Sequence, residues 1–77
     1  LRKVETARLM VEVAEEAKAL NLEKARLAGN QLKAGLVPAA KAAEAEAAAR
    51  ASEADVLAAR LGLDLAYAEL DQLLGLR

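Results

Sequence analysis

Acidic side chains are the residues of this chain whose types and spacing could support chemistry. One cluster comprises Glu12, Glu15 and Glu16, and a second comprises Glu44 and Glu46. Clustered carboxylates can bind a metal ion or work as an acid and base pair. The 77-residue chain has no His and no Cys, so it lacks the His of helical di-metal sites and the usual general base. We therefore expect a solvated acidic face, with no metal site and no cofactor.

The hydroxyl groups and the glycine-containing segments offer no catalytic alternative. Thr6 and Ser52 have no neighbouring base that could activate them as nucleophiles. Segments 29–31 and 35–38 contain glycine but lack the glycine spacing and the Lys-Ser/Thr pair of a phosphate-binding loop. The sequence therefore predicts a protein that is not an enzyme.

The composition predicts helices and excludes several kinds of partner. Ala, Leu, Glu, Lys and Arg make up 56 of the 77 residues, which is well above the roughly 50% that marks long helices and coiled coils. With a net charge of −1 and a single aromatic residue, the chain lacks the basic and stacking surfaces of nucleic-acid-binding proteins. The longest segment without charge, 34–40, is far shorter than the ~20 residues of a membrane span.

The clearest break in the helical pattern is the segment 35–38. Gly35 can adopt the left-handed conformation that ends a helix, Val37 is held extended by the following proline, and Pro38 suits the first turn of a new helix. A connection this short makes its two helices antiparallel neighbours. We predict an all-α fold, an antiparallel two-helix coiled-coil hairpin with helices at about 2–34 and 38–74.

Two other places in the chain could interrupt a helix. The pair Gly29 and Asn30 forms a competing turn, because both residues tolerate positive φ. Gly62 lies inside a good helical pattern, and we interpret it as a point of close approach between helices. The chain opens at 1–5 with the pattern of a helix already under way, so we expect residues 1–77 to be one hairpin excised from a longer polypeptide.

Each predicted helix carries two apolar seams with heptad spacing, and each seam can contact one neighbouring helix. An isolated hairpin would leave the second seams in water, so we expect self-association into a helical bundle, layer or barrel. In the first helix the first seam comprises Val4, Ala7, Val11, Ala14, Lys18, Asn21, Ala25, Ala28 and Leu32, and the second comprises Met10, Val13, Ala17, Leu20, Leu27 and Ala34. In the second helix the first seam comprises Ala42, Ala45, Ala49, Ser52, Val56, Ala59, Leu63, Ala66, Leu70 and Leu73, and the second comprises Ala40, Ala43, Ala47, Ala54, Leu57, Leu61 and Ala68.

Polar and apolar residues at unusual positions mark two candidate sites. Lys18 and Asn21 interrupt an apolar seam, where polar residues commonly specify register. They could instead line a solvent channel or make a discrete functional contact. Leu36 and Val37 are apolar residues at the end of a rod, where they could form a docking surface. Alternatively, Leu36 could complete the hydrophobic contact of the helix C-cap.

The order of residues resembles one periplasmic helical hairpin of the TolC-like outer membrane efflux family. That family's repeat has a helix ending in an Ala/Val-Gly-Leu-Val tip, then a helix with recurring Ala, an Ala-Arg step and a terminal Leu-Gly. The matching features of this chain are the run 32–38, the Ala/Glu stretch 43–47, the Ala59-Arg60 step, Tyr67 and the closing run 69–75.

This resemblance implies a trimeric conduit for multidrug efflux or type I secretion, whose hairpins form an α-barrel across the periplasm. The chain would then be the periplasmic part of an outer membrane protein. In that family the tip of the hairpin engages a periplasmic adaptor, or membrane fusion, protein. Ala34, Gly35 and Leu36 match the tip motif and would contact the adaptor, and Val37 completes the predicted partner-binding tip.

Two alternative functions remain open at the level of sequence. The first is the coiled-coil hairpin of the adaptor itself, which usually carries an Arg-Leu-Ser-like tip. Here the similar run 26–28, Arg-Leu-Ala, precedes the turn and does not form it. The second is a cytosolic or designed coiled-coil oligomerisation module with no transport role.

Overall fold

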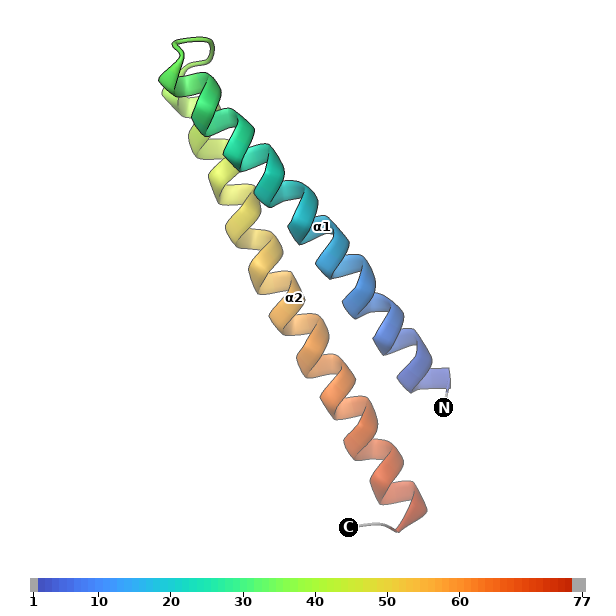
Figure 1. The fold of residues 1–77 in the computed structure, drawn as a ribbon. Helices are drawn as coiled ribbons and strands as arrows, with labels where there is room; N and C mark the ends of the chain where they lie inside the picture. Colours follow the sequence, from blue (N-terminus) through green and yellow to red (C-terminus); the bar gives the residue numbers. More distant parts are fainter. Residues whose placement is uncertain (1, 76–77) are drawn as a thin grey trace.

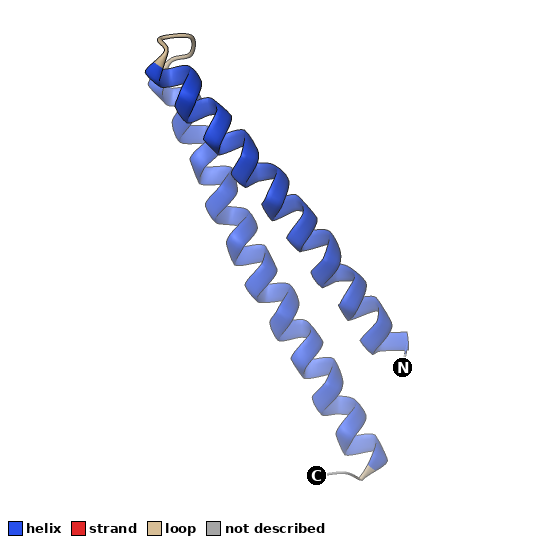
Figure 2. Ribbon diagram, viewed as in Figure 1, coloured by secondary structure: helices blue, strands red, loops and turns tan. Residues whose placement is uncertain are grey.

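The computed structural model describes residues 2–75, which form two α-helices joined by a short turn. Helix α1 spans Arg2–Lys33 and helix α2 spans Ala39–Leu74. The two helices run antiparallel and side by side (Figure 1). Figure 2 shows that the described residues outside the helices are confined to the turn and to the end of α2. The predicted all-α helical hairpin is confirmed.

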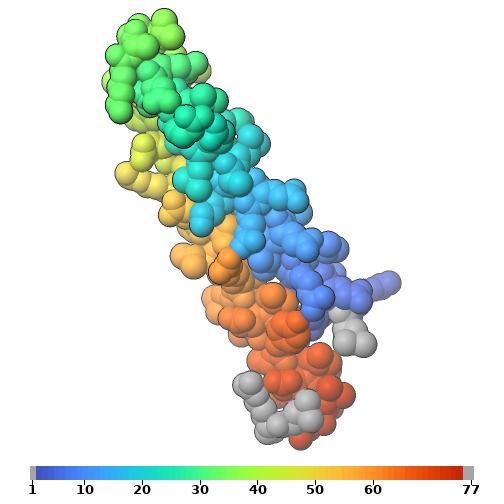
Figure 3. Space-filling model, viewed as in Figure 1, coloured from blue at the N-terminus to red at the C-terminus, as the bar shows by residue number. Residues whose placement is uncertain are grey.

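The length of the helices sets the shape of the molecule. The hairpin measures 60 × 14 × 12 Å, and Figure 3 shows a slender rod with the turn at one end. At about 1.5 Å per residue, the 32 residues of α1 and the 36 residues of α2 correspond to about 48 and 54 Å. The turn is therefore held far from the other end of the hairpin.

A glycine ends α1 one residue earlier than predicted. Gly35 is left-handed, with φ of 74°, and its N–H donates to the Leu32 carbonyl at 3.0 Å. The N–H of Leu36 donates to the Gln31 carbonyl at 2.8 Å. These two bonds form a Schellman motif, in which Gly35 is the first residue beyond the helix cap. The cap is Ala34, so the helical conformation stops at Lys33 and not at residue 34.

Pro38 precedes α2 and does not form its first turn. Its φ of −74° and ψ of 156° are those of extended backbone, so the helix begins at Ala39. The Pro38 carbonyl nevertheless accepts a hydrogen bond from the Lys41 N–H at 3.0 Å. This combination defines an N-cap residue, and the fixed φ of proline is compatible with it. The helix therefore starts one residue after the predicted boundary of about 38.

The two first seams face each other and form the core. The buried residues are Val4 on α1 and Ala49, Ser52, Val56 and Ala66 on α2. The other members of the first seams are half-buried, except for Leu32 beside the turn and Leu73 near the end of α2, which are exposed. The heptad pattern therefore predicted the interhelical interface correctly along almost its whole length.

The remaining glycines do not interrupt the helices. Gly29 and Asn30 lie inside α1, and Gly62 lies inside α2. A Cβ atom at Gly62 would meet nothing within 4 Å, so the backbone there approaches no other part of the hairpin. The expected close approach at Gly62 is wrong within the described residues, because this glycine lies beside the seam and not in it.

Candidate functional site

The turn presents an apolar side chain at the end of the rod. Ala34 and Gly35 are exposed, and Leu36 retains 74% of its accessible surface. In a Schellman motif, the residue at the Leu36 position often packs against an apolar side chain in the last turns of the helix. Here the two positions that could supply this contact are the polar residues Gln31 and Asn30. Leu36 therefore projects into solvent instead of completing the helix cap.

Val37 behaves differently from the rest of the predicted tip. It is half-buried and lines a hollow of about 550 Å³ between the two helices. The lining comes from Lys24, Ala28 and Gln31 of α1 and from Lys41, Glu44 and Ala45 of α2. Val37 was predicted to belong to the exposed partner-binding tip, but the turn places it beside residues of both helices. The exposed part of the predicted tip is thus 34–36.

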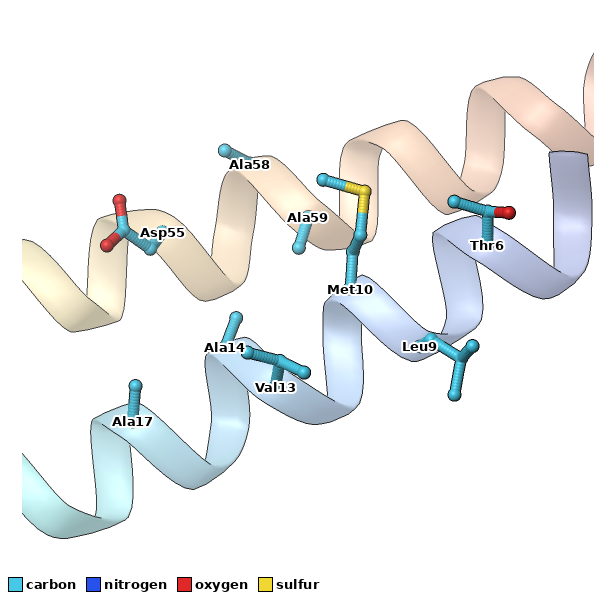
Figure 4. Close-up of a pocket in the computed structure, with 9 residues that line it drawn as sticks. All are labelled: Thr6, Leu9, Met10, Val13, Ala14, Ala17, Asp55, Ala58 and Ala59. Carbon is cyan, nitrogen blue, oxygen red and sulfur yellow. The ribbon is translucent and has the colours of Figure 1, made fainter.

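A second apolar surface lies nearer the open end of the hairpin. It is a shallow groove of about 620 Å³ between the helices, lined mainly by aliphatic side chains. Figure 4 shows Met10 reaching from α1 toward Ala58 and Ala59 of α2, while the Asp55 carboxylate points away from α1. Met10 is 60% exposed and Val13 is 66% exposed. We call the side of the hairpin that carries this groove the groove side.

Polar interactions close the opposite side of the hairpin. Glu15 and Arg60 form an ion pair, and Arg8 donates a hydrogen bond to the Tyr67 hydroxyl at 2.9 Å. In the sequence, each of these four residues directly follows a residue of a first seam, whereas Met10 directly precedes one. The four polar residues and Met10 therefore lie on opposite sides of the interface between the helices. The hydrogen bond from Arg8 to Tyr67 raises the pKa of the Arg8 guanidinium. We call this side the ion-pair side.

A polar pair crosses the centre of the core. The Asn21 amide of α1 donates to the Ser52 hydroxyl of α2, and that hydroxyl donates to the Ala48 carbonyl at 3.0 Å. Lys18 is half-buried in the same seam. Sequence analysis placed Asn21 and Ser52 in facing seams but did not pair them. A count of residues from the turn in both directions could have found the pair, because both lie at the same level of the hairpin.

Several of the acidic side chains take part in exposed ion pairs. Glu23 pairs with Arg26 along α1, and this hydrogen bond holds the pKa of the Glu23 carboxyl below its usual range. Glu46 and Arg50 lie 3.6 Å apart along α2. The contact between Glu15 and Arg60 was not predicted, because it joins different helices. Across residues 2–75, no three acidic side chains converge in an arrangement that could hold a metal ion.

Neither the geometry nor the comparisons with other proteins name a function for these surfaces. In the part of the chain that the structure describes, neither helix combines the length and apolar character that a bilayer span requires. Comparisons with models of protein families, with curated proteins and with solved structures each found no match. The function proposed below therefore rests on the residues of this chain and on how the hairpin displays them.

Proposed function

We propose that this chain is a periplasmic hairpin of a TolC-like outer membrane channel for efflux or secretion, acting as barrel wall and as adaptor-docking tip. The observation that carries this proposal is the exposure of the second apolar seam on both helices. Residues of these seams retain about half or more of their accessible surface: Met10 60%, Val13 66%, Leu20 56% and Leu27 48% on α1, and Leu57 70% and Leu61 60% on α2. Exposed apolar side chains of this size mark a surface for another helix to cover.

The positions of the two second seams support a wall more than a closed bundle. Val13 of α1 lies on the groove side, where it lines the groove. Leu57 of α2 directly follows the seam residue Val56, so it lies on the ion-pair side with Arg60. The hairpin therefore offers one apolar flank on each side. A stave in the wall of a barrel needs this arrangement, because it contacts one neighbour on either flank.

The structure of the turn supports the docking role of the tip. Two backbone hydrogen bonds fix the chain around Gly35, and Val37 anchors the turn against both helices. Leu36 is thereby held out from the end of the rod at 74% exposure. A rigid, exposed apolar side chain at a tip is suited to bind a partner, because little conformational freedom is lost on binding.

The position of Arg26 speaks against the alternative that this chain is the adaptor's own hairpin. Residues 26–28, which are the closest match to an adaptor tip, lie inside α1. The Arg26 guanidinium is paired with Glu23 on the same helix. An Arg held along the side of the rod cannot contribute to contacts made by its end.

Binding to a purified periplasmic adaptor from the same genome tests the docking role. We expect Leu36→Ser to weaken binding at least tenfold, roughly the effect of removing one central apolar anchor from an interface. Leu73→Ser is the matched control, because Leu73 is 84% exposed at the other end of the rod. Gly35→Asp should also reduce binding, but it strains the left-handed residue as well as changing the surface.

Unchanged binding of the Leu36→Ser variant, or equal loss with Leu73→Ser, would show that the tip is not the docking site. The parent gene provides the second test. A signal peptide and flanking segments rich in β-strands are expected for the channel, whereas an oligomerisation module would have neither.

A further inference from the structure

The two sides of the hairpin differ in charge, and this difference identifies the more apolar side. Between Lys3 and Lys24, the residues of α1 that face the groove side are uncharged. On α2 the corresponding stretch from Glu44 to Glu69 contains one charged residue on this side, Asp55. The ion-pair side is crowded with charges and has its own contacts between the helices. Water solvates the charged side well but not the groove side.

The groove side also has a pattern of side-chain size. On α1 it carries the large residues Met10, Val13 and Leu20, whereas on α2 it carries the small residues Ala51, Ala58 and Gly62 and one large residue, Leu65, which is 57% exposed. The contacts between Arg8 and Tyr67 and between Asn21 and Ser52 fix which residues lie at the same level. By this register, Met10 and Val13 lie level with Gly62, and Leu20 lies level with the segment 51–55.

We propose that a second copy of this chain packs on the groove side, with its tip at the same end, to form a four-helix bundle. A two-fold axis along the rod places α1 of each copy against α2 of the other at the same level. Met10 and Val13 of one copy then fill the space that Gly62 leaves open on the other, where a Cβ atom would meet nothing. The same axis places Leu20 against the small residues of 51–55.

Charge at the ends of the apolar stretch selects this orientation over the opposite one. Lys3 pairs with Glu69 at 2.7 Å within the hairpin. In the tips-together dimer, Lys3 also lies level with the second copy's Glu69, which is an attractive arrangement. With the tips at opposite ends, α1 would lie against α1, and overlap of the apolar stretches would bring Lys3 close to the second copy's Lys24. Large residues would then also oppose large ones.

The apolar part of the groove side covers about half of the rod. On α1 the uncharged stretch of this side between Lys3 and Lys24 is about 30 Å long at about 1.5 Å per residue, against a rod length of 60 Å. Among residues 2–75 of the single hairpin, four apolar residues are buried, so the bundle adds substantially to a small core. This dimer concerns the chain on its own and stands independently of the channel function.

Measurement of the molar mass by light scattering tests the dimer. We expect a mass twice that of the 8.1-kDa chain, and we expect Val13→Lys to reduce it to that of the single chain. Leu57→Lys is the matched control, because Leu57 is as exposed as Val13 but lies on the ion-pair side. A monomer or a trimer for the unchanged chain, or equal disruption by Leu57→Lys, would overturn the proposal.

Spin labels at the tip test the orientation. The chain contains no Cys, so Leu36→Cys provides one attachment site in each copy. With tips together, we expect a label-to-label distance below about 30 Å, because neighbouring helices pack 8–10 Å apart. A distance near the 60 Å length of the rod would show the opposite orientation and overturn the proposed packing.

Discussion

Asn21 and Ser52 place a hydrogen bond inside a seam that is otherwise mostly apolar. Many of the seam residues around this pair are Ala, so alternative registers of the two helices would bury similar areas. A hydrogen bond between these two side chains can form in only one register of the helices. A slip by one heptad would break it and leave the half-buried Asn21 and the buried Ser52 without this partner. We infer that this pair fixes the register and thereby the position of the turn.

Removing both polar groups tests this role. We expect Asn21→Leu combined with Ser52→Ala to raise the melting temperature by up to about 5 °C, because about 1 kcal/mol of polar burial is removed. We also expect a broader distance distribution between spin labels at the exposed positions Glu16 and Ala54, since the helices can then slide. A distribution as narrow as that of the parent would contradict the register role.

The ion pair between Glu23 and Arg26 gives a prediction on pH. Arg26 lowers the pKa of Glu23 in the folded state, so the pair stabilises α1 above the unfolded-state pKa of the carboxyl, about 4.3. This contribution is lost as the pH falls through the lowered pKa of the folded state. We expect Arg26→Ala to raise the pKa of Glu23, measured by NMR titration of its carboxyl. An unchanged titration would show that the pair does not persist in solution.

At the scale of the elements, the sequence determines where the helices lie but not their exact ends. The heptad spacing of small and aliphatic residues predicted both helices and the core residues, because burial depends mainly on which face a residue occupies. The boundaries at 34 and 38 depend on the conformation of Gly35 and Pro38, and both residues are compatible with more than one cap position. The contact between Glu15 and Arg60 was missed, since it depends on the register between helices.

Two glycines give opposite predictions for the same substitution. Gly35→Ala should lower the free energy of unfolding by about 1 kcal/mol, because its φ of 74° disfavours a side chain. Gly29→Ala should raise it by up to about 1 kcal/mol, since Gly29 lies inside α1, away from the proposed dimer contact, and a Cβ atom there meets nothing within 4 Å. Urea denaturation at equal chain concentration measures both. Changes of the same sign would contradict this account of the turn.

At the scale of the whole molecule, the hairpin is a rod that buries little of its apolar surface by itself. Its first seams form the core, as the heptad pattern predicted, and its second seams are exposed. The sequence could show that these second seams exist, but the partner that covers them belongs to another chain. Packing within the hairpin buries the first seam of each helix. The proposed functions therefore involve the exposed second seams.

The central claim is that both apolar flanks are covered in the working assembly, and cysteine labelling tests it most directly. The parent chain lacks Cys, so Val13→Cys and Leu57→Cys report on the groove side and the ion-pair side, with the exposed Glu16→Cys as control. In the purified chain we expect slow labelling of Val13→Cys and rapid labelling of the other two cysteines. In the full-length channel in outer membranes we expect Val13→Cys and Leu57→Cys to be protected and Glu16→Cys to react. Rapid labelling of Leu57→Cys in that assembly would contradict the account.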